Sequence, residues 1–336
     1  MNTKKTMITG GAGFIGSHIA RRMVEAGHQV LNYDLVNPTH EAAWWLKPVI
    51  REIQFASGSV EDQAKVTAVV KNFRPEIIIH LAAVVNPVLL KKEPGLAFRI
   101  NLGGTLNILE AARQFGVERV VNSSSQSVLS PIQYEPVDAD HPLMTAKDGP
   151  GASFYSATKI GGEAFCWAYH QSYELDFITI RASAVYGIGQ QWPIYIKPFV
   201  ENSINGIPTH YETGGDYPRD YTHVEDVAQI YHKAACLEAE NVKDRIFYAA
   251  SGQPLVTASQ VASTVKSLIP NADIEIGPGL SAEDQHALRY RGVLSIENAI
   301  QQLGYKPKYA NIKDGLVEYI DQYRRYLTDS GQTESR

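Results

Sequence analysis

The stretch that decides the fold is TGGAGFIG at residues 9–16. A short apolar run precedes it and residues 14–26 carry the apolar spacing of a helix, so it lies at a strand-to-helix turn. Glycine is required where such a turn leaves no room for a Cβ atom and where the backbone approaches a pyrophosphate. The N–H groups that open the helix would hold that pyrophosphate. The stretch therefore predicts a dinucleotide site made by Gly10, Gly13, Phe14, Ile15 and Gly16.

An acidic residue further along the chain supports the same interpretation. Asp34 ends the second predicted strand, 29–33, and lies about 20 residues beyond the glycine turn, as the dinucleotide-binding fingerprint requires. Its carboxylate would accept hydrogen bonds from an adenosine ribose and would repel a 2′-phosphate. The sequence therefore predicts NAD rather than NADP as the cofactor.

Composition excludes several classes of protein. The chain has 336 residues, 31 Lys and Arg against 36 Asp and Glu, a net charge of −5 and 44% hydrophobic residues. These values are typical of a globular chain, and the negative charge argues against nucleic acid as the main partner. No apolar run approaches the roughly 18 residues that a membrane span needs. Cys166 and Cys236 make no disulfide framework, which favours a cytoplasmic location, and we expect no metal site.

Strand-like and helical patterns alternate through the first half of the chain, which predicts a doubly wound parallel sheet of the α/β Rossmann type. After residue 181, glycine and proline interrupt the chain repeatedly. We expect an NAD-binding domain over 1–181 and a smaller substrate-binding lobe over 182–330 that contributes some strands to the sheet. The predicted strands are 6–9, 29–33, 50–55, 77–81 and 119–122, and the predicted helices are 14–26, 62–72, 97–115, 155–173, 224–238, 259–268 and 312–327.

A tyrosine and a lysine suggest proton chemistry. Tyr155 and Lys159 are four residues apart at the start of a predicted helix, so they share one helix face. A free tyrosine has a pKa of ~10, too high for a base at neutral pH, but a lysine ammonium nearby favours the phenolate. Such a pair can take a proton from a secondary alcohol as hydride leaves its carbon. Ser125, just beyond a predicted strand, could hydrogen-bond the reacting oxygen. On spacing alone, an exposed helix face and a polar turn are the more common alternatives.

Together these features resemble the extended short-chain dehydrogenase/reductase family, the NAD-dependent epimerase/dehydratase group. The resemblance runs from about residue 6 to residue 327 and rests on the order and spacing of several short stretches. They are residues 9–16, Asp34, 80–83 (HLAA), 101–105 (NLGGT), 123–125, Tyr155 with Lys159, 181–187, 219–221 (RDY) and 303–307 (LGYKP).

The resemblance implies a role for each matching residue. Ser125 would be the catalytic hydroxyl, Tyr155 the acid/base, and Lys159 would bind the nicotinamide ribose. The family's usual acid near Gly58 is replaced by Ser59, so the adenine contact there would fall to the backbone. The remaining cofactor contacts that we expect are Ser59, Val60, Leu81, Ala82, Ala83 and, as a support for the site, Asn101.

The reaction is narrowed by the residues that follow the catalytic serine. Dehydratases that the chain resembles place Asp-Glu there, whereas this chain has Gln126-Ser127. Neither side chain can act as a general acid for the loss of water, so we do not expect 4,6-dehydration. The reaction that remains possible is oxidation and reduction at one carbinol carbon. An epimerase would return the hydride to the product, whereas a dehydrogenase would keep it on the cofactor. Ser127 is expected to contact the substrate.

The substrate side gives mixed signals. Many nucleotide-sugar members carry an asparagine at the position of Ala184, which weakens that interpretation. Arg219 matches an epimerase arginine that binds phosphate, and Arg289 or Arg291 could supply a second cation. A guanidinium group suits phosphate and carboxylate equally. The alternative for Arg219 is a structural ion pair with Asp220 or Asp226.

Three functions therefore remain open. The first is an NAD-dependent epimerase, most simply of a nucleotide sugar. The second is an NAD-dependent dehydrogenase of a smaller sugar acid or hydroxy acid, and the third is an NAD-binding sensor without turnover. In the first two the partner is an anionic small molecule. A homodimer is also expected, because the helices 97–115 and 155–173 carry apolar residues beyond what one sheet face needs: Leu106, Ile108, Leu109, Phe165, Trp167 and Tyr169.

Overall fold

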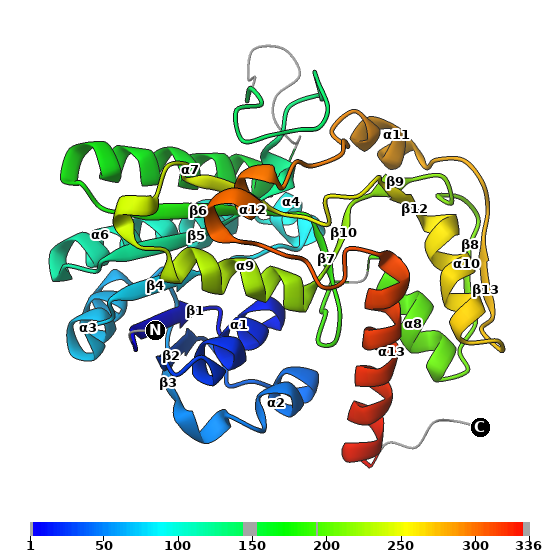
Figure 1. Ribbon diagram of the computed structural model, residues 1–336, viewed down its shortest axis with the longest axis horizontal. Coiled ribbons are helices and arrows are strands. Elements are labelled where there is room, and N and C mark those ends of the chain that lie inside the picture. The colour runs from blue at the N-terminus through cyan, green and yellow to red at the C-terminus, as the bar shows by residue number, and fades with distance from the viewer. Residues whose placement is uncertain (1–2, 144–152, 193, 332–336) are drawn as a thin grey trace.

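A parallel sheet of seven strands forms the centre of the molecule (Figure 1). The computed structural model describes residues 3–143, 153–192 and 194–331. The strand order is β3-β2-β1-β4-β5-β6-β11, so the chain reverses its direction of winding between β1 and β4. The strands are β1 Lys5–Thr9, β2 Gln29–Asp34, β3 Ile53–Ser57, β4 Ile77–His80, β5 Arg119–Ser125, β6 Phe177–Ala182 and β11 Ile246–Ala249.

Helices cover both faces of this sheet, which is why β4 and β6 are buried along their whole length. On one face lie α1 (Phe14–Glu25) and α9 (Val224–Cys236), beside α2 (His40–Leu46) and α12 (Glu297–Leu303). On the other lie α3 (Gln63–Phe73), α6 (Gly104–Phe115) and α7 (Phe154–Tyr173). This arrangement confirms the predicted Rossmann-type α/β fold, with its ligand crevice expected where the strand order reverses.

A second apolar cluster lies beyond the carboxyl ends of the strands. It is built from α8 (Ile196–Ile204), α10 (Ala258–Leu268) and α13 (Ile312–Asp329), on the right in Figure 1. Three strand pairs accompany them: β7 Ala184–Tyr186 with β10 Tyr221–His223, β8 Thr209–Tyr211 with β13 Ile274–Ile276, and β9 Pro218–Arg219 with β12 Val256–Thr257.

Several elements differ from the sequence predictions. The helix expected over 97–115 begins as a π-helical segment, Ala97–Gly103, where Gly103 and Gly104 weaken the α-helical preference. The strand expected over 50–55 begins with the 3-10 turn Ile50–Glu52. Helices that the sequence did not predict are α2, α4 (Pro87–Lys92), α5 (Pro94–Leu96), α8, α11 (Ala282–Leu288) and α12. The prolines and acidic residues of 131–151 predict a long loop, of which residues 144–151 lie outside the described residues. No helix in the described ranges has the length and apolarity to cross a membrane.

Candidate active site

A cleft of about 730 Å³ opens at the carboxyl ends of the central strands. Its walls include the glycine turn after β1, the segments that follow β2, β3 and β4, and residues of α7. It continues to Ala184, Arg219 and Arg291, which lie beyond the sheet. The cleft is therefore at the reversal of strand order, and it joins the predicted cofactor residues to the predicted substrate residues.

The glycine turn shapes the floor of the cleft. Gly10 has φ +71°, and a Cβ atom there would lie 3.0 Å from the backbone nitrogen of Ala82. A Cβ atom on Gly16 would overlap the carbonyl oxygen of Gly10. Helix α1 begins at Phe14 with Gly13 as N-cap, and no side chain caps it. The first N–H groups of the helix, including that of Ile15, thus lack intrahelical partners and line an anion site, so these residues fit a dinucleotide pyrophosphate.

The carboxylate of Asp34 is fixed at the edge of the cleft. One oxygen accepts the backbone N–H of Ala12 at 3.0 Å, and the other accepts that of Leu35 at 2.7 Å. These bonds hold the glycine turn and the end of β2 together. They also keep a negative charge at the position where the adenosine ribose of a dinucleotide would lie.

The charge of Asp34 leads to a prediction about cofactor choice. We expect NAD to be preferred over NADP in kcat/KM by at least about tenfold, because like charges in contact cost on the order of several kcal/mol. Comparing kcat/KM with the two cofactors tests this, and Asp34→Asn should narrow the ratio. A wild-type preference for NADP would show that Asp34 does not face the 2′ position.

Five of the other predicted cofactor residues line the cleft. They are Ser59, Val60, Leu81, Ala82 and Ala83. The hydroxyl of Ser59 is turned to its own loop, where it accepts the N–H of Glu61 at 3.1 Å.

Asn101, which we expect to support the site, lies behind the wall of the cleft. Asn101 is buried and is not among the residues that line the cleft. Its Oδ1 accepts the N–H of Val84 at 2.7 Å, and its Nδ2 donates to the Val84 carbonyl at 2.9 Å. Asn101 therefore fixes the loop after β4 from behind.

The three predicted catalytic residues meet in the cleft. Tyr155 and Lys159 project from α7 into the cleft, where Ser125 at the end of β5 also lies. The Nζ of Lys159 lies 5.5 Å from the centre of the Tyr155 ring and donates to the Ser123 carbonyl at 2.6 Å. The structure thus joins two hydroxyls and one ammonium group at the bottom of the cleft.

Burial perturbs the proton affinities of this group. It raises the pKa of Tyr155 to about 12, against which the hydrogen bond from Ser125 acts. It lowers the pKa of Lys159 to about 8, against which the charge of Glu163 acts. Desolvation favours the neutral form of each group. A cation bound over this site would therefore favour the phenolate of Tyr155.

Two arginines flank Tyr217 at the far end of the cleft. The Arg219 guanidinium lies 4.7 Å from the Tyr217 ring centre, and Arg291 Nε donates to the Tyr217 hydroxyl at 2.7 Å. Burial, with the charge of Arg219 acting in the same direction, lowers the pKa of Arg291. No carboxylate of the described residues pairs with Arg219, whose Nε is buried without a partner.

The acids proposed as structural partners of Arg219 are engaged elsewhere. Asp220 accepts the hydroxyl of Ser251 at 2.7 Å, and Asp226 accepts the N–H groups of Lys308 and Tyr309 at 2.6 and 2.8 Å. Within the described residues no carboxylate forms a salt bridge with Arg219 or Arg291, so the two adjacent cations can form a site for an anion.

Arg289 does not belong to this site, contrary to the sequence prediction. It is exposed beside His286, 3.4 Å away, and lies over the ring of Tyr290. The second cation of the cleft is Arg291.

The other predicted substrate residues, Ala184 and Ser127, line the cleft. The Ser127 hydroxyl is buried without a partner in the described part of the chain. Lining residues that the sequence did not single out include Ser153, Gln190, Gln191, Trp192 and Ile194.

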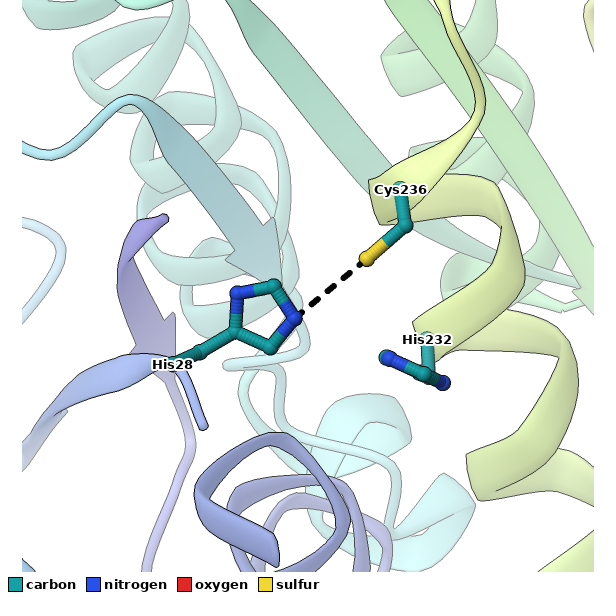
Figure 2. A group of neighbouring side chains, drawn as sticks. All are labelled: His28, His232 and Cys236. Carbon is teal, nitrogen blue, oxygen red and sulfur yellow. Dashed lines mark hydrogen bonds between the residues drawn. The ribbon is translucent and has the colours of Figure 1, made fainter. Parts of the chain in front are cut away.

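A second group of side chains, His28, His232 and Cys236, has the composition of a metal site (Figure 2). None of the three lines the cleft. His28 Nδ1 accepts the N–H of Lys4 at 3.1 Å, so neutral His28 carries its proton on Nε2 and donates it towards Cys236 Sγ, 3.5 Å away. A metal ion would need the lone pair of that same nitrogen. The hydrogen bonds therefore describe a link between the start of β1 and α9, and the absence of a metal stays a prediction.

The family is identified by a comparison of sequences. The family model of the NAD dependent epimerase/dehydratase family matches residues 6–250. The chain belongs to this family. It is therefore an NAD-dependent enzyme of the extended short-chain dehydrogenase/reductase type, and the predicted cofactor is confirmed as NAD.

Members of the family with known names match almost the whole chain. The UDP-glucose 4-epimerase of Mycolicibacterium smegmatis is 28% identical, covering 95% of this chain and 98% of its own. The CDP-paratose 2-epimerase of Salmonella typhi is also 28% identical, covering 94% and 98%. The crystal structure of Thermus thermophilus UDP-glucose 4-epimerase with NAD is 29% identical, with a TM-score of 0.77 over 95% of this chain and 99% of that one.

Proposed function

We propose that this enzyme is an epimerase that inverts a secondary-alcohol carbon of a nucleotide sugar. One observation carries the proposal: a single cleft holds Tyr155, Lys159 and Ser125 at one end and the cation pair of Arg219 and Arg291 at the other. The first set suits proton transfer to and from an alcohol oxygen. The second suits a diphosphate. Two named relatives, a UDP-glucose 4-epimerase and a CDP-paratose 2-epimerase, act on nucleotide sugars.

The chemistry follows from what each side chain can do. NAD, when bound, supplies the acceptor for the hydride and later returns it. Tyr155 takes the proton of the sugar hydroxyl and gives it back, while Ser125, which lines the same cleft, holds the reacting oxygen. The ammonium of Lys159 lies 5.5 Å from the Tyr155 ring, where it favours the phenolate. Lys159 is also expected to bind the nicotinamide ribose.

Arg219 and Arg291 would bind the diphosphate. A guanidinium group can donate two parallel hydrogen bonds to a phosphate, and the bonds are charge-assisted. Arg291 keeps part of its donor set for the substrate, because only its Nε is bonded to Tyr217 in the described structure. Ser127 would contact the sugar, since its buried hydroxyl has no partner there. Ala184 would leave space beside the diphosphate.

A dehydrogenase of a smaller sugar acid remains the second candidate, because Ala184 lacks the amide that many nucleotide-sugar enzymes have there. A thermal-shift screen of the NAD-loaded protein separates the two. A ligand at 100 times its dissociation constant stabilises the folded state by about 2.7 kcal/mol. We expect uridine or deoxythymidine diphosphates to raise the melting temperature and small hydroxy acids to leave it unchanged. The reverse pattern would favour the dehydrogenase, and no shift with either class would favour a sensor.

We also propose that the enzyme is a homodimer that pairs α6 and α7 with their copies. On α7, Trp167 and Tyr173 are 39% and 56% exposed. On α6 the expectation needs correction, because Ile108 and Leu109 are fully buried against the sheet. Light scattering at micromolar concentration should give twice the mass of the chain, and Trp167→Glu should give a monomer. A monomeric wild type would contradict this arrangement.

Two further expectations are kept as proposals. The boundary between the NAD-binding domain and the substrate lobe would lie near residue 181, with β11 and α9 returning to the sheet after it. A cytoplasmic location is supported by Cys166 and Cys236, which are not joined in a disulfide.

A further inference from the structure

We propose that Glu163 is a positioning residue for the reaction, joining the strand that carries Ser125 to the helix that carries Tyr155 and Lys159. Glu163 follows Lys159 by four residues and Tyr155 by eight on α7, so all three lie on one face of that helix. Its carboxylate does not line the cleft but lies directly behind it. The inference rests on the proposed function only where turnover is measured, because that measurement needs a nucleotide-sugar substrate.

The carboxylate of Glu163 is held rigidly. Its Oε1 accepts Arg181 Nε at 2.9 Å, and its Oε2 accepts Arg181 Nη2 at 2.8 Å. The two residues are only 4% and 2% exposed. The remaining Nη1 of Arg181 donates to the Tyr248 hydroxyl at 3.2 Å. A two-bond pair of this kind fixes the orientation of both groups, and removing one partner would leave a buried charge uncompensated.

Two successive residues of β5 are tied to α7 by this arrangement. The hydroxyl of Ser124 donates to Glu163 Oε1 at 2.6 Å, and the carbonyl of Ser123 accepts Lys159 Nζ at 2.6 Å. The next residue of the strand is Ser125, which lines the cleft together with Tyr155. The distance between the two reacting hydroxyls thus depends on how β5 is held against α7. The bond between Ser124 and Glu163 is one of the side-chain bonds that set it.

Glu163 also determines the charge around Lys159. The titratable groups that face Lys159 are Tyr155, Glu163 and Cys166 from α7 and His80 from β4. Burial keeps Tyr155 and Cys166 protonated at neutral pH by raising their pKa values, and it keeps His80 neutral by lowering its pKa to about 3. Glu163, in its ion pair with Arg181, is therefore the negative charge that supports the Lys159 ammonium.

The test uses variants that change either the charge of the residue at position 163 or the length of its side chain. Glu163→Gln with Arg181→Gln replaces the ion pair by two amides, which avoids an unpaired buried charge. Glu163→Asp keeps the charge, but its shorter side chain cannot reach both Ser124 and Arg181. The control is Asp176→Asn, which alters a half-buried ion-pair cluster of Asp176 with Arg119 and Arg245 at the opposite end of β5 and β6. Each variant is compared with wild type by melting temperature, NAD affinity, kcat and KM.

A second readout needs no substrate. The rate at which acetic anhydride acylates Lys159, followed by mass spectrometry, reports the free amine. In the double variant we expect this rate at neutral pH to rise about fivefold, because loss of the Glu163 charge should lower the pKa of Lys159 from about 8 by about a unit. Turnover should fall about tenfold through misplacement of Ser125, with KM nearly unchanged. Glu163→Asp should lower kcat but leave the acylation rate at the wild-type value. The control should change neither.

The outcomes are distinguishable. A folded double variant with wild-type kcat and wild-type acylation of Lys159 would overturn the proposal. If the double variant does not fold, wild-type kcat in Glu163→Asp would overturn it. If the wild-type enzyme converts no nucleotide sugar, the proposed function has failed, and the acylation rates decide the role of Glu163 by themselves.

Discussion

The Tyr155→Phe variant is expected to keep its fold and its affinity for NAD and to lose at least about 100-fold in kcat, the lower range for a general acid/base. The phenyl ring still fills the buried position on α7, so packing changes little. The lost group is the hydroxyl that lies in the cleft with Ser125 and that would exchange the substrate proton. The measurement is kcat together with NAD affinity on the same preparation.

A matched control for this variant lies on the same helix. Tyr169→Phe also removes one hydroxyl from α7, but that hydroxyl donates to Glu110 at 3.2 Å, and Tyr169 does not line the cleft. We expect near wild-type kcat for Tyr169→Phe. Near wild-type kcat for Tyr155→Phe would remove the role assigned to it.

The Arg219→Ala variant is expected to raise KM by roughly tenfold to 150-fold, because losing one charge-assisted contact costs about 1.5–3 kcal/mol. The effect should appear mainly in KM, since a diphosphate remote from the reacting carbon is bound equally in ground and transition states. Arg219→Lys should recover only part of the loss, because an ammonium group cannot donate two parallel bonds.

Arg289→Ala is the control for this second result. This variant also removes an arginine side chain, but one that is exposed on the surface and lies two residues before Arg291 in the sequence. We expect its KM to match wild type, whereas Arg291→Ala should raise KM as Arg219→Ala does. An unchanged KM in Arg219→Ala would show that this arginine is structural.

The features that the sequence predicted best depend on local chain geometry. The glycine turn and Asp34 could be located because a tight turn and a strand end impose residue types at fixed spacing, and the structure places both in the cleft. Tyr155 and Lys159 could be paired because four residues make about one helical turn. Their position opposite Ser125 depends on the parallel sheet, which the alternation of strands and helices also predicted.

The features that sequence reasoning missed depend on tertiary placement. Arg289 and Arg291 are two residues apart after α11, and only the path of the chain decides that Arg291 turns inward to Tyr217. Asn101 is expected to support the site, but the sequence does not say which segment its amide holds, and the structure shows that it is the backbone of Val84. The sequence could not show whether Ile108 packs against the sheet or against a second subunit, because an apolar side chain suits either contact.

The most direct test of the nucleotide-sugar epimerase is an assay without added cofactor. The purified enzyme is incubated with UDP-glucose, and the sugar is followed by NMR while the near-ultraviolet absorbance of NADH is recorded. If UDP-glucose is not converted, the same assay is repeated with other uridine- and cytidine-linked sugars. The proposed function predicts inversion at one carbon of a nucleotide sugar with no accumulation of NADH. Stoichiometric NADH production that requires added NAD, with no inverted sugar from any of these substrates, would contradict it.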